Sequence, residues 1–206
     1  MKFSKSLLGA AAAVALLAST SASAVSFNLN IPTGATYGTV TLTQFDGNTV
    51  AVHVDLADAY NFVDTGSHEA FGFNVLGAAT ITDISPGTAY SATGTFSQSA
   101  FGTFTLGVAC SSPTCQGGNN SSSPNDILDF HVNLAGITVG SFGTNTSGYA
   151  FTADVFGPNP TGGSMTFPVA SNGTPVPGVP EPETYALMLA GLGAVGFVAR
   201  RRKQPA

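Results

Sequence analysis

Apolar and polar residues alternate along most of the chain, and this period of two predicts β-strands. The alternation is clearest on either side of the turn sequence Asp46-Gly47-Asn48, which predicts a hairpin. We expect strands at residues 40–42, 50–56, 71–75, 104–108, 128–134, 149–155 and 165–169, with a further one at Phe96. Turns rich in Gly, Pro and Asn separate these runs, and no apolar stripe recurs at helical spacing between residues 25 and 179. The pattern therefore predicts an all-β domain, either an antiparallel β-sandwich or a jelly roll.

The two ends of the chain depart from this pattern. At the N-terminus, two lysines precede an apolar run at residues 7–18, and the small residues Ala22 and Ala24 follow at the spacing that signal peptidase accepts. The run is too short for a mature membrane anchor. We therefore expect residues 1–24 to be a signal peptide that is cleaved after Ala24.

The C-terminal end carries a second apolar run, at residues 185–199. This run predicts one transmembrane helix, and the basic residues after it should remain on the cytoplasmic side. Those basic residues are Arg200, Arg201, Arg202 and Lys203. The residues just before the run are Val179, Pro180, Glu181 and Pro182. The physical pattern alone predicts a single-pass anchor with the domain outside the inner membrane.

The order of these parts, a Pro-Glu-Pro motif, a short apolar helix and an Arg-rich end, resembles the PEP-CTERM tails of Gram-negative bacteria. The resemblance implies recognition and processing by exosortase near residues 179–182. It also implies inner-membrane anchoring before processing, a final location at the cell surface or in the extracellular matrix, and association with exopolysaccharide and biofilm. It covers only the tail and gives no activity for the domain. The predicted parts are a signal peptide at 1–24, a β-sandwich domain at 25–170, a Pro- and Gly-rich linker at 171–179 and a sorting tail at 180–206.

The charge distribution narrows the functions that the central domain can have. All 6 Lys and Arg lie in the two ends, and nine of the 11 acids lie between residues 25 and 179, which gives that span a formal charge of −9 with His neutral. Nucleic acid is excluded as a partner because phosphate binding needs cations. Any buried carboxylate in this span needs a hydrogen-bond donor, a metal or a proton, since neither Lys nor Arg is present to pair with it.

The only two cysteines, Cys110 and Cys115, lie close together in the sequence. An exported chain meets an oxidising compartment, which favours a disulfide between them. A zinc site would need further ligands nearby, and a redox motif would have the narrower C-x-x-C spacing. We therefore expect a local disulfide.

Four acids are concentrated in one segment: Asp55, Asp58, Asp64 and Glu69. Clustered carboxylate oxygens without a basic partner are what Ca²⁺ requires, although the spacing does not match an EF-hand. The alternative is an acidic, solvated loop that keeps an exported protein soluble. Both interpretations stay open at this point.

The three histidines, His53, His68 and His131, could join acids in a metal or hydrolytic site. His53 and His131 fall on the polar face of expected strands, which favours exposed side chains. A hydrolase would need an activated serine, and no G-x-S-x-G elbow is present. We expect a non-enzymatic surface or matrix protein. A carbohydrate-binding module, with or without calcium, is the alternative, and a secreted hydrolase is a third hypothesis.

Overall fold

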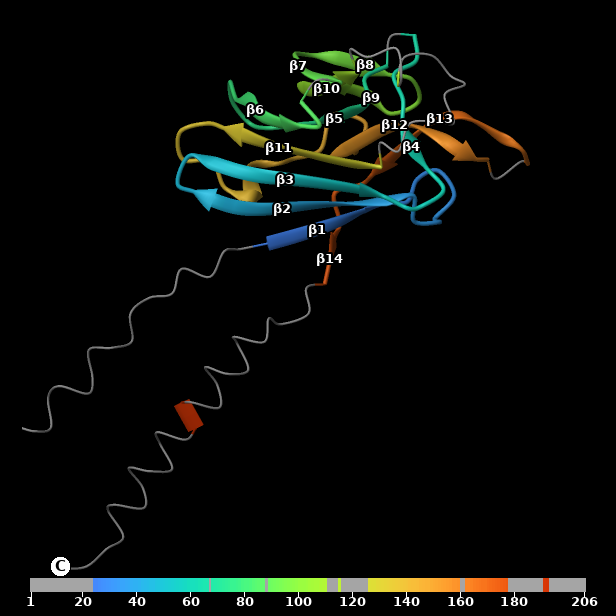
Figure 1. Cartoon of the computed structure of the whole chain (residues 1–206). Coiled ribbons are helices and arrows are strands. Elements are labelled where there is room, and N and C mark those ends of the chain that lie inside the picture. The colour runs from blue at the N-terminus through green and yellow to red at the C-terminus, as the bar shows by residue number, and fades with distance from the viewer. Residues whose placement is uncertain are drawn as a thin grey trace, which may run out of the picture.

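Two antiparallel sheets packed face to face form the domain (Figure 1). The computed structural model describes residues 24–66, 68–87, 89–110, 115, 126–159, 162–177 and 191–192. The first sheet has the order β14 (Pro175–Val176), β1 (Ala24–Leu29), β2 (Gly38–Asp46), β3 (Thr49–Leu56), β11 (Ile127–Asn133) and β6 (Thr80–Ser85). The second has the order β13 (Ser164–Ser171), β12 (Phe151–Pro158), β5 (Phe71–Phe73), β10 (Leu106–Cys110) and β7 (Tyr90–Thr93). Neither sheet closes on itself, and the all-β prediction is confirmed.

The hairpin of β2 and β3 shows how the alternation produces the first sheet. The valines of β3 are buried, whereas His53 and Asp55 between them are exposed. The Asn48 N–H donates to the Asp46 side chain at 2.7 Å, which closes the predicted turn. Val40 then lies opposite Val54, so one face of the hairpin is apolar throughout.

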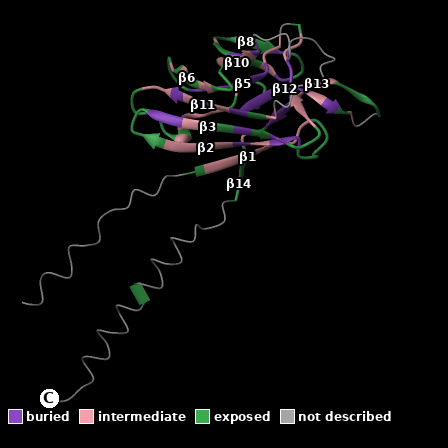
Figure 2. Ribbon diagram, viewed as in Figure 1, coloured by how far each residue is buried: buried purple, intermediate pink, exposed green. Residues whose placement is uncertain are grey.

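Phenylalanine rings join the two sheets across the core. Phe130 of β11 lies 5.5 Å from Phe73 and 5.9 Å from Phe71, both of β5, and Phe27 of β1 lies 5.0 Å from Phe151 of β12. All five rings are buried, and Figure 2 shows buried residues along the facing strands. Burying each ring stabilises the fold by about 1.5–3 kcal/mol, so these contacts hold the layers together.

A small hairpin, β8 (Phe96–Gln98) and β9 (Gly102–Phe104), covers the other face of the second sheet. Because Phe71 and Phe73 point into the core, position 72 between them faces outward, and glycine there leaves room for the Phe96 ring. Phe101 and Phe104 of the hairpin region pack with Ala170 in a second, smaller apolar cluster. This hairpin therefore buries side chains that would otherwise be on the surface of the sandwich.

Several elements differ from the expectations drawn from the sequence. The expected strand at 104–108 is two strands, β9 and β10, and five strands were not expected: β1, β4 (Asn61–Phe62), β6, β7 and β14. β6 carries mostly polar, exposed side chains at a sheet edge, so its alternation is weak. The linker prediction is also partly wrong, because Ser171 ends β13, and Pro175–Val176 form β14, which pairs with β1.

The terminal predictions fall largely outside the described residues. The signal peptide with Ala22, the sorting residues Val179 to Pro182 and the basic cluster at 200–203 all lie there, as does nearly all of the expected transmembrane helix. Within the described ranges, no helix has both the length and the apolar content needed to cross a membrane. Ala24, the residue before the expected cleavage point, is the first residue of β1.

Candidate functional site

Residues 63–66 and 68–70, which we call the 63–70 loop, lie beside the strand β12 and interrupt its pairing. Both β4 and β5 pair with β12, and the chain leaves the ladder between them. The Val63 N–H donates to the Asp154 carbonyl at 3.0 Å, and the Asp154 N–H donates to the Ala70 carbonyl at 3.1 Å. The 63–70 loop is therefore anchored at both ends on the backbone of Asp154, and its polar side chains lie close to the side chain of that residue.

Asp154 is a buried acid in a region without lysine or arginine. Its neighbours Ala153 and Val155 face the core, so its side chain points to the opposite face of the sheet, yet it is only 1% exposed. One carboxylate oxygen, Oδ2, accepts a hydrogen bond from the Thr65 hydroxyl, while Oδ1 has no partner among the described residues. Burial raises the pKa of Asp154, and the Thr65 hydrogen bond and the nearby His68 oppose that shift.

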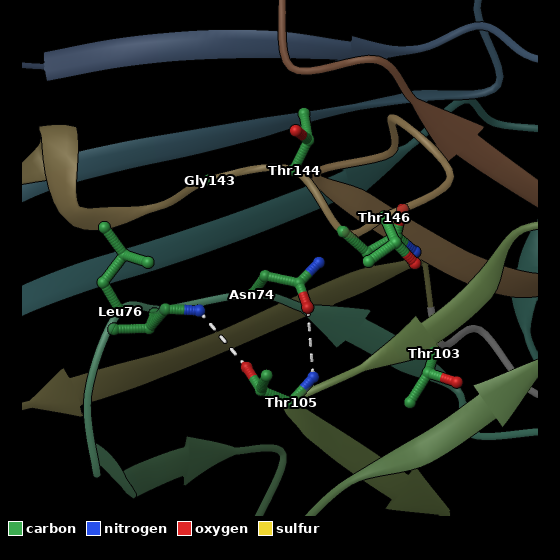
Figure 3. A pocket seen from close by; sticks show the side chains of 9 residues that line it. Asn74, Leu76, Thr103, Thr105, Gly143, Thr144 and Thr146 are labelled. Carbon is green, nitrogen blue, oxygen red and sulfur yellow. Dashed lines mark hydrogen bonds between the residues drawn. The ribbon is translucent and has the colours of Figure 1, made fainter.

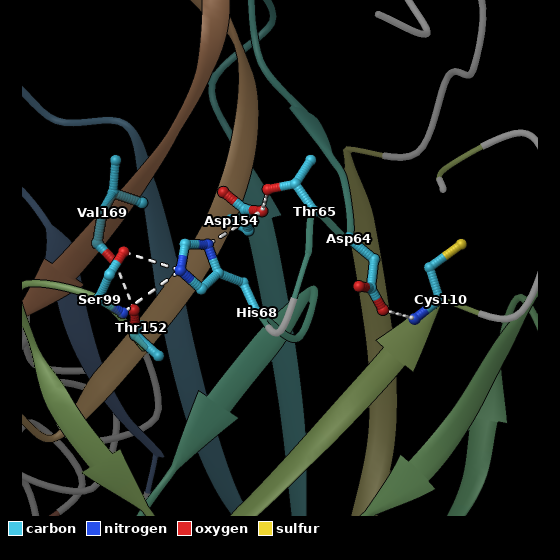
Figure 4. Close-up of polar contacts among 8 residues, drawn as sticks. All are labelled: Asp64, Thr65, His68, Ser99, Cys110, Thr152, Asp154 and Val169. Carbon is cyan, nitrogen blue, oxygen red and sulfur yellow. Dashed lines mark hydrogen bonds and ion pairs between the residues drawn. The ribbon is translucent and has the colours of Figure 1, made fainter. Parts of the chain in front are cut away.

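His68 connects this buried acid to an exposed serine (Figure 4). The His68 Nδ1 atom lies 3.7 Å from Asp154 Oδ2, and His68 Nε2 lies 2.7 Å from Ser99 Oγ. The Ser99 backbone N–H also donates to Nε2, at 3.4 Å. We refer to Ser99, His68 and Asp154 as the polar relay. Exposure increases along it, from the buried Asp154 through His68, whose side chain is 20% exposed, to the exposed Ser99.

The turn that joins β8 to β9 positions Ser99. The Phe101 N–H donates to the Gln98 carbonyl at 3.1 Å, and Ala100 has a φ of +72°. This is the geometry of a type II turn, in which glycine usually occupies the position of Ala100. The turn thus holds Ala100 in a conformation that costs a non-glycine residue about 1 kcal/mol or more.

The disulfide lies beside the same loop. Cys110 and Cys115 are bonded, with their Cα atoms 6.0 Å apart, which confirms the predicted pairing in this structure. Asp64 contacts both ends of it: the Cys110 N–H donates to Asp64 Oδ2 at 3.0 Å, and the Asp64 N–H donates to the Cys115 carbonyl at 2.9 Å. Burial raises the pKa of Asp64, and burial together with the charge of Asp64 raises the pKa of Glu69.

The expected calcium ligands do not form a coordination site. Asp55 and Asp58 are exposed, whereas Asp64 and Glu69 are partly buried in the 63–70 loop. In the part of the chain that the structure describes, no three His, Cys, Asp or Glu side chains are placed to hold a metal ion. The segment is therefore divided between a solvated pair, Asp55 and Asp58, and a partly buried pair, Asp64 and Glu69, whose charges interact with each other.

His53 and His131 lie on the outer face of the first sheet, as expected for strand histidines on the polar face. His53 Nδ1 is 2.6 Å from Asp129 Oδ1, and His131 Nδ1 is 3.0 Å from Asp83 Oδ2. All three histidines of the chain therefore contact an aspartate. Because both of these pairs are substantially exposed, their contribution to stability is small.

A second candidate is a shallow cleft of about 280 Å³ between three segments far apart in the sequence (Figure 3). The lining residues are Asn74, Val75, Leu76, Thr103, Thr105, Gly143, Thr144, Asn145 and Thr146. Asn74 Oδ1 accepts a hydrogen bond from the Thr105 N–H at 3.2 Å, and Leu76 is 78% exposed. Hydroxyl and amide groups beside an apolar side chain can bind a neutral polar ligand, and no lining residue is charged.

Neither site was predicted as a whole from the sequence. His68 was named among the three histidines, but Ser99, Thr65 and Asp154 were not connected with it. The signal that points to Asp154 is an acid at an outward position between buried apolar residues, in a span without lysine or arginine. The cleft consists of threonines and asparagines that are too common in this chain to stand out.

The domain between the two ends of the chain is therefore an open, two-sheet β-sandwich. Its two candidate sites, the polar relay and the cleft, lie at the second sheet, which the β8–β9 hairpin covers. The tail adds a sorting signal, since residues 178–203 match the PEP-CTERM protein-sorting motif. This match confirms the resemblance seen in the tail and is consistent with an exosortase substrate. The motif implies an exported protein that is anchored in the membrane before processing. No curated protein and no solved structure matches the chain.

Proposed function

We propose that this protein is a surface or matrix protein of a Gram-negative bacterium, exported by its signal peptide, released from the inner membrane by exosortase and retained with exopolysaccharide in the biofilm. The observation that carries the proposal is the sorting motif at residues 178–203. The way the domain ends supports it: β14 pairs with β1, with Val176 opposite Ser26. The tail thus follows directly from a strand that is hydrogen-bonded to the first strand of the domain. The role proposed for the sorted chain is display and association.

The test of this proposal is processing of the tail. Replacing Pro180, Glu181 and Pro182 with alanine in the full chain should leave export unchanged and block cleavage. Immunoblots of membrane, surface and medium fractions should then show an uncleaved form retained in the membrane. A control variant with alanine at Pro175, before the motif, should be processed normally. Equal processing of the motif variant and the wild-type chain would contradict the proposal.

A second candidate function is carbohydrate binding, and the cleft of Figure 3 favours it. Its lining is neutral and combines hydroxyl, amide and apolar groups, which suits the hydroxyl edges and apolar faces of sugar rings. The formal charge of −9 on the surrounding span favours neutral over acidic polysaccharides. Calcium has no part in this version, because the acids of the 63–70 loop are not among the lining residues.

Binding of the full chain to neutral exopolysaccharide, measured by calorimetry, tests the cleft. Thr103 and Thr146 are exposed in the lining, and the Thr103→Val/Thr146→Val double variant should lose most of the affinity. Thr80→Val is the matched control, because Thr80 is exposed on β6 in the other sheet. Equal affinities of the double variant and the control would exclude the cleft as the binding site.

A further inference from the structure

We propose that Ser99, His68 and Asp154 form a nucleophilic site that hydrolyses short, uncharged acyl esters. The three side chains come from the β8–β9 turn, the 63–70 loop and β12, and they lie in the order of a nucleophile, a general base and a carboxylate (Figure 4). This activity goes beyond display on the cell surface and does not depend on it.

The hydrogen bonds of His68 define which of its nitrogens carries the proton. The Ser99 backbone N–H can only donate, and it donates to His68 Nε2 at 3.4 Å. Nε2 of the neutral ring is therefore the unprotonated nitrogen, and the proton lies on Nδ1. In this tautomer the Nε2 lone pair also faces the Ser99 hydroxyl at 2.7 Å, which is within the range for a general base.

Asp154 is placed to stabilise the cation that forms on His68. The His68 Nδ1 atom is buried and has no hydrogen-bond partner among the described residues. Asp154 Oδ1 is also buried and also has no partner there. Asp154 Oδ2 lies 3.7 Å from Nδ1, so a small rotation of the ring closes a hydrogen bond between them. Because the span from 25 to 179 contains neither Lys nor Arg, His68 is the cation available to this 1% exposed carboxylate.

The residue after the serine supplies a donor for the oxyanion. The Ala100 N–H makes no hydrogen bond within the described ranges, and the φ of +72° holds it in the turn next to Ser99. In serine hydrolases of the nucleophile-elbow type, the N–H that follows the nucleophile serves this purpose. A backbone conformation that costs free energy at this position is consistent with a functional turn.

The reaction needs only the ester and water. Ser99 Oγ bonds to the carbonyl carbon of the ester as its proton passes to His68 Nε2. The electrons of the C=O double bond move to the carbonyl oxygen, and this oxyanion accepts a hydrogen bond from the Ala100 N–H. The tetrahedral intermediate collapses, the C–O bond to the alcohol breaks, and the alcohol takes the proton from Nε2. Water then attacks the acylated Ser99, gives its proton to Nε2, and releases the acid as Ser99 regains a proton.

The surroundings define the class of substrate. Ser99 and Ala100 are exposed on a turn, so the ester must project from its carrier, as acyl groups on the hydroxyls of a polymer do. Asp64 and Glu69 belong to the same loop as His68, and their charges repel anionic acyl groups. Short uncharged acyl esters fit both conditions.

The experiment uses the full chain in detergent with a fluorophosphonate probe and with p-nitrophenyl acetate. We expect one phosphonate adduct, mapped to Ser99 by peptide mass spectrometry. The Ser99→Ala variant should lose the adduct and about 100-fold or more of the hydrolysis rate, since general base catalysis contributes about 10²–10⁴-fold. Ser97→Ala is the matched control, because Ser97 is exposed on β8 two positions away, and it should behave as the wild-type chain does.

Asp154→Asn separates a positioning role from a structural one. As a positioning residue, Asp154 should affect kcat while leaving KM unchanged, and its replacement should shift the pH profile that His68 imposes on the rate. The His68→Gln variant should lose that profile. Absence of a Ser99 adduct on folded wild-type protein, or equal hydrolysis by Ser99→Ala and the wild-type chain, would overturn the proposal and leave the relay as a contact that holds the hairpin. Because the adduct is measured on the wild-type protein, its presence or absence tests Ser99 as the nucleophile even where a variant is unstable.

Discussion

Replacing Gly72 with alanine tests whether the β8–β9 hairpin is docked on the second sheet as described. An added Cβ would lie 2.7 Å from Cε1 of Phe96 and 3.1 Å from Cγ2 of Thr152, with Phe96 Cζ closer still. Carbon atoms in ordinary contact are about 3.5–4.0 Å apart. The Phe96 ring must therefore retreat from Gly72 by about 1 Å or more.

The expected loss of stability follows from these contacts. Overpacking of this kind costs about 1–3 kcal/mol. The loss of glycine's freedom in the unfolded chain returns about 0.4–1 kcal/mol. Full undocking would expose Phe101 and Phe104 and add about 1.5–3 kcal/mol for each ring. We therefore expect a net loss of about 1–3 kcal/mol with the hairpin shifted, and more if it leaves the sheet.

Urea unfolding of the variant, followed by circular dichroism, measures this loss. Gly94→Ala is the control, because an added Cβ there has no atom within 4 Å, and it should change stability by about 0.5 kcal/mol or less. Phe96→Ala in the Gly72→Ala background should recover part of the loss, since it removes the group that collides. A Gly72→Ala variant as stable as the control would refute the described contact between Phe96 and Gly72.

Four further predictions follow from the described residues. Ala100→Gly should stabilise the protein by about 0.5–1 kcal/mol and Gly136→Ala should destabilise it by a similar amount, since both positions have a φ of +72°. Chemical denaturation measures both changes in the free energy of unfolding, and changes of the same sign would contradict the strain at Ala100. The pKa values of Asp64, Glu69 and Asp154 are raised in the folded state, so stability should fall as pH rises from about 4 through those raised values, and Asp154→Asn should flatten that slope in melting curves. Thiol titration of the denatured, unreduced protein should detect no free thiol, and reduction of Cys110–Cys115 should cost about 2–3 kcal/mol at most; two reactive thiols would contradict the disulfide. Calcium and sodium chloride at matched ionic strength should shift the melting midpoint equally, because no coordination site is formed in the described part, and a larger shift with calcium would reveal one.

The alternation predicted the elements whose one face is buried in the core. β3 and β11 carry buried residues at every second position and lie side by side in the first sheet, and both were expected nearly at their observed bounds. β6 escaped prediction because its side chains are mostly exposed, so the pattern that marks a strand is missing. β4 and β14 have two residues each, too few for any periodicity.

The polar relay could not be predicted because its geometry depends on pairings between distant parts of the chain. His68 reaches Asp154 only because β4 and β5 both pair with β12 and force residues 63–70 into a loop at that point. Ser99 reaches His68 only because Gly72 and Gly107 leave space for Phe96. Neither the pairing of β4 and β5 with β12 nor the packing of Phe96 on the two glycines can be read from a local sequence pattern. The disulfide, in contrast, could be predicted from two neighbouring cysteines and the export context.

The charge distribution explains why Thr65 and His68 gather around Asp154. Phenylalanine rings fill the space between the sheets, so an acid of β12 can point only to the outer face. On an open sheet that face would be solvated, but the 63–70 loop is bonded to the Asp154 backbone at both ends, and Asp154 is 1% exposed. Without Lys or Arg, the chain stabilises this carboxylate with Thr65, through its hydroxyl and its backbone, and with the imidazole of His68. Burial of the acid and placement of the imidazole beside it are thus consequences of the same loop, whereas the hairpin supplies Ser99, and a change that lifts the hairpin should separate Ser99 from His68.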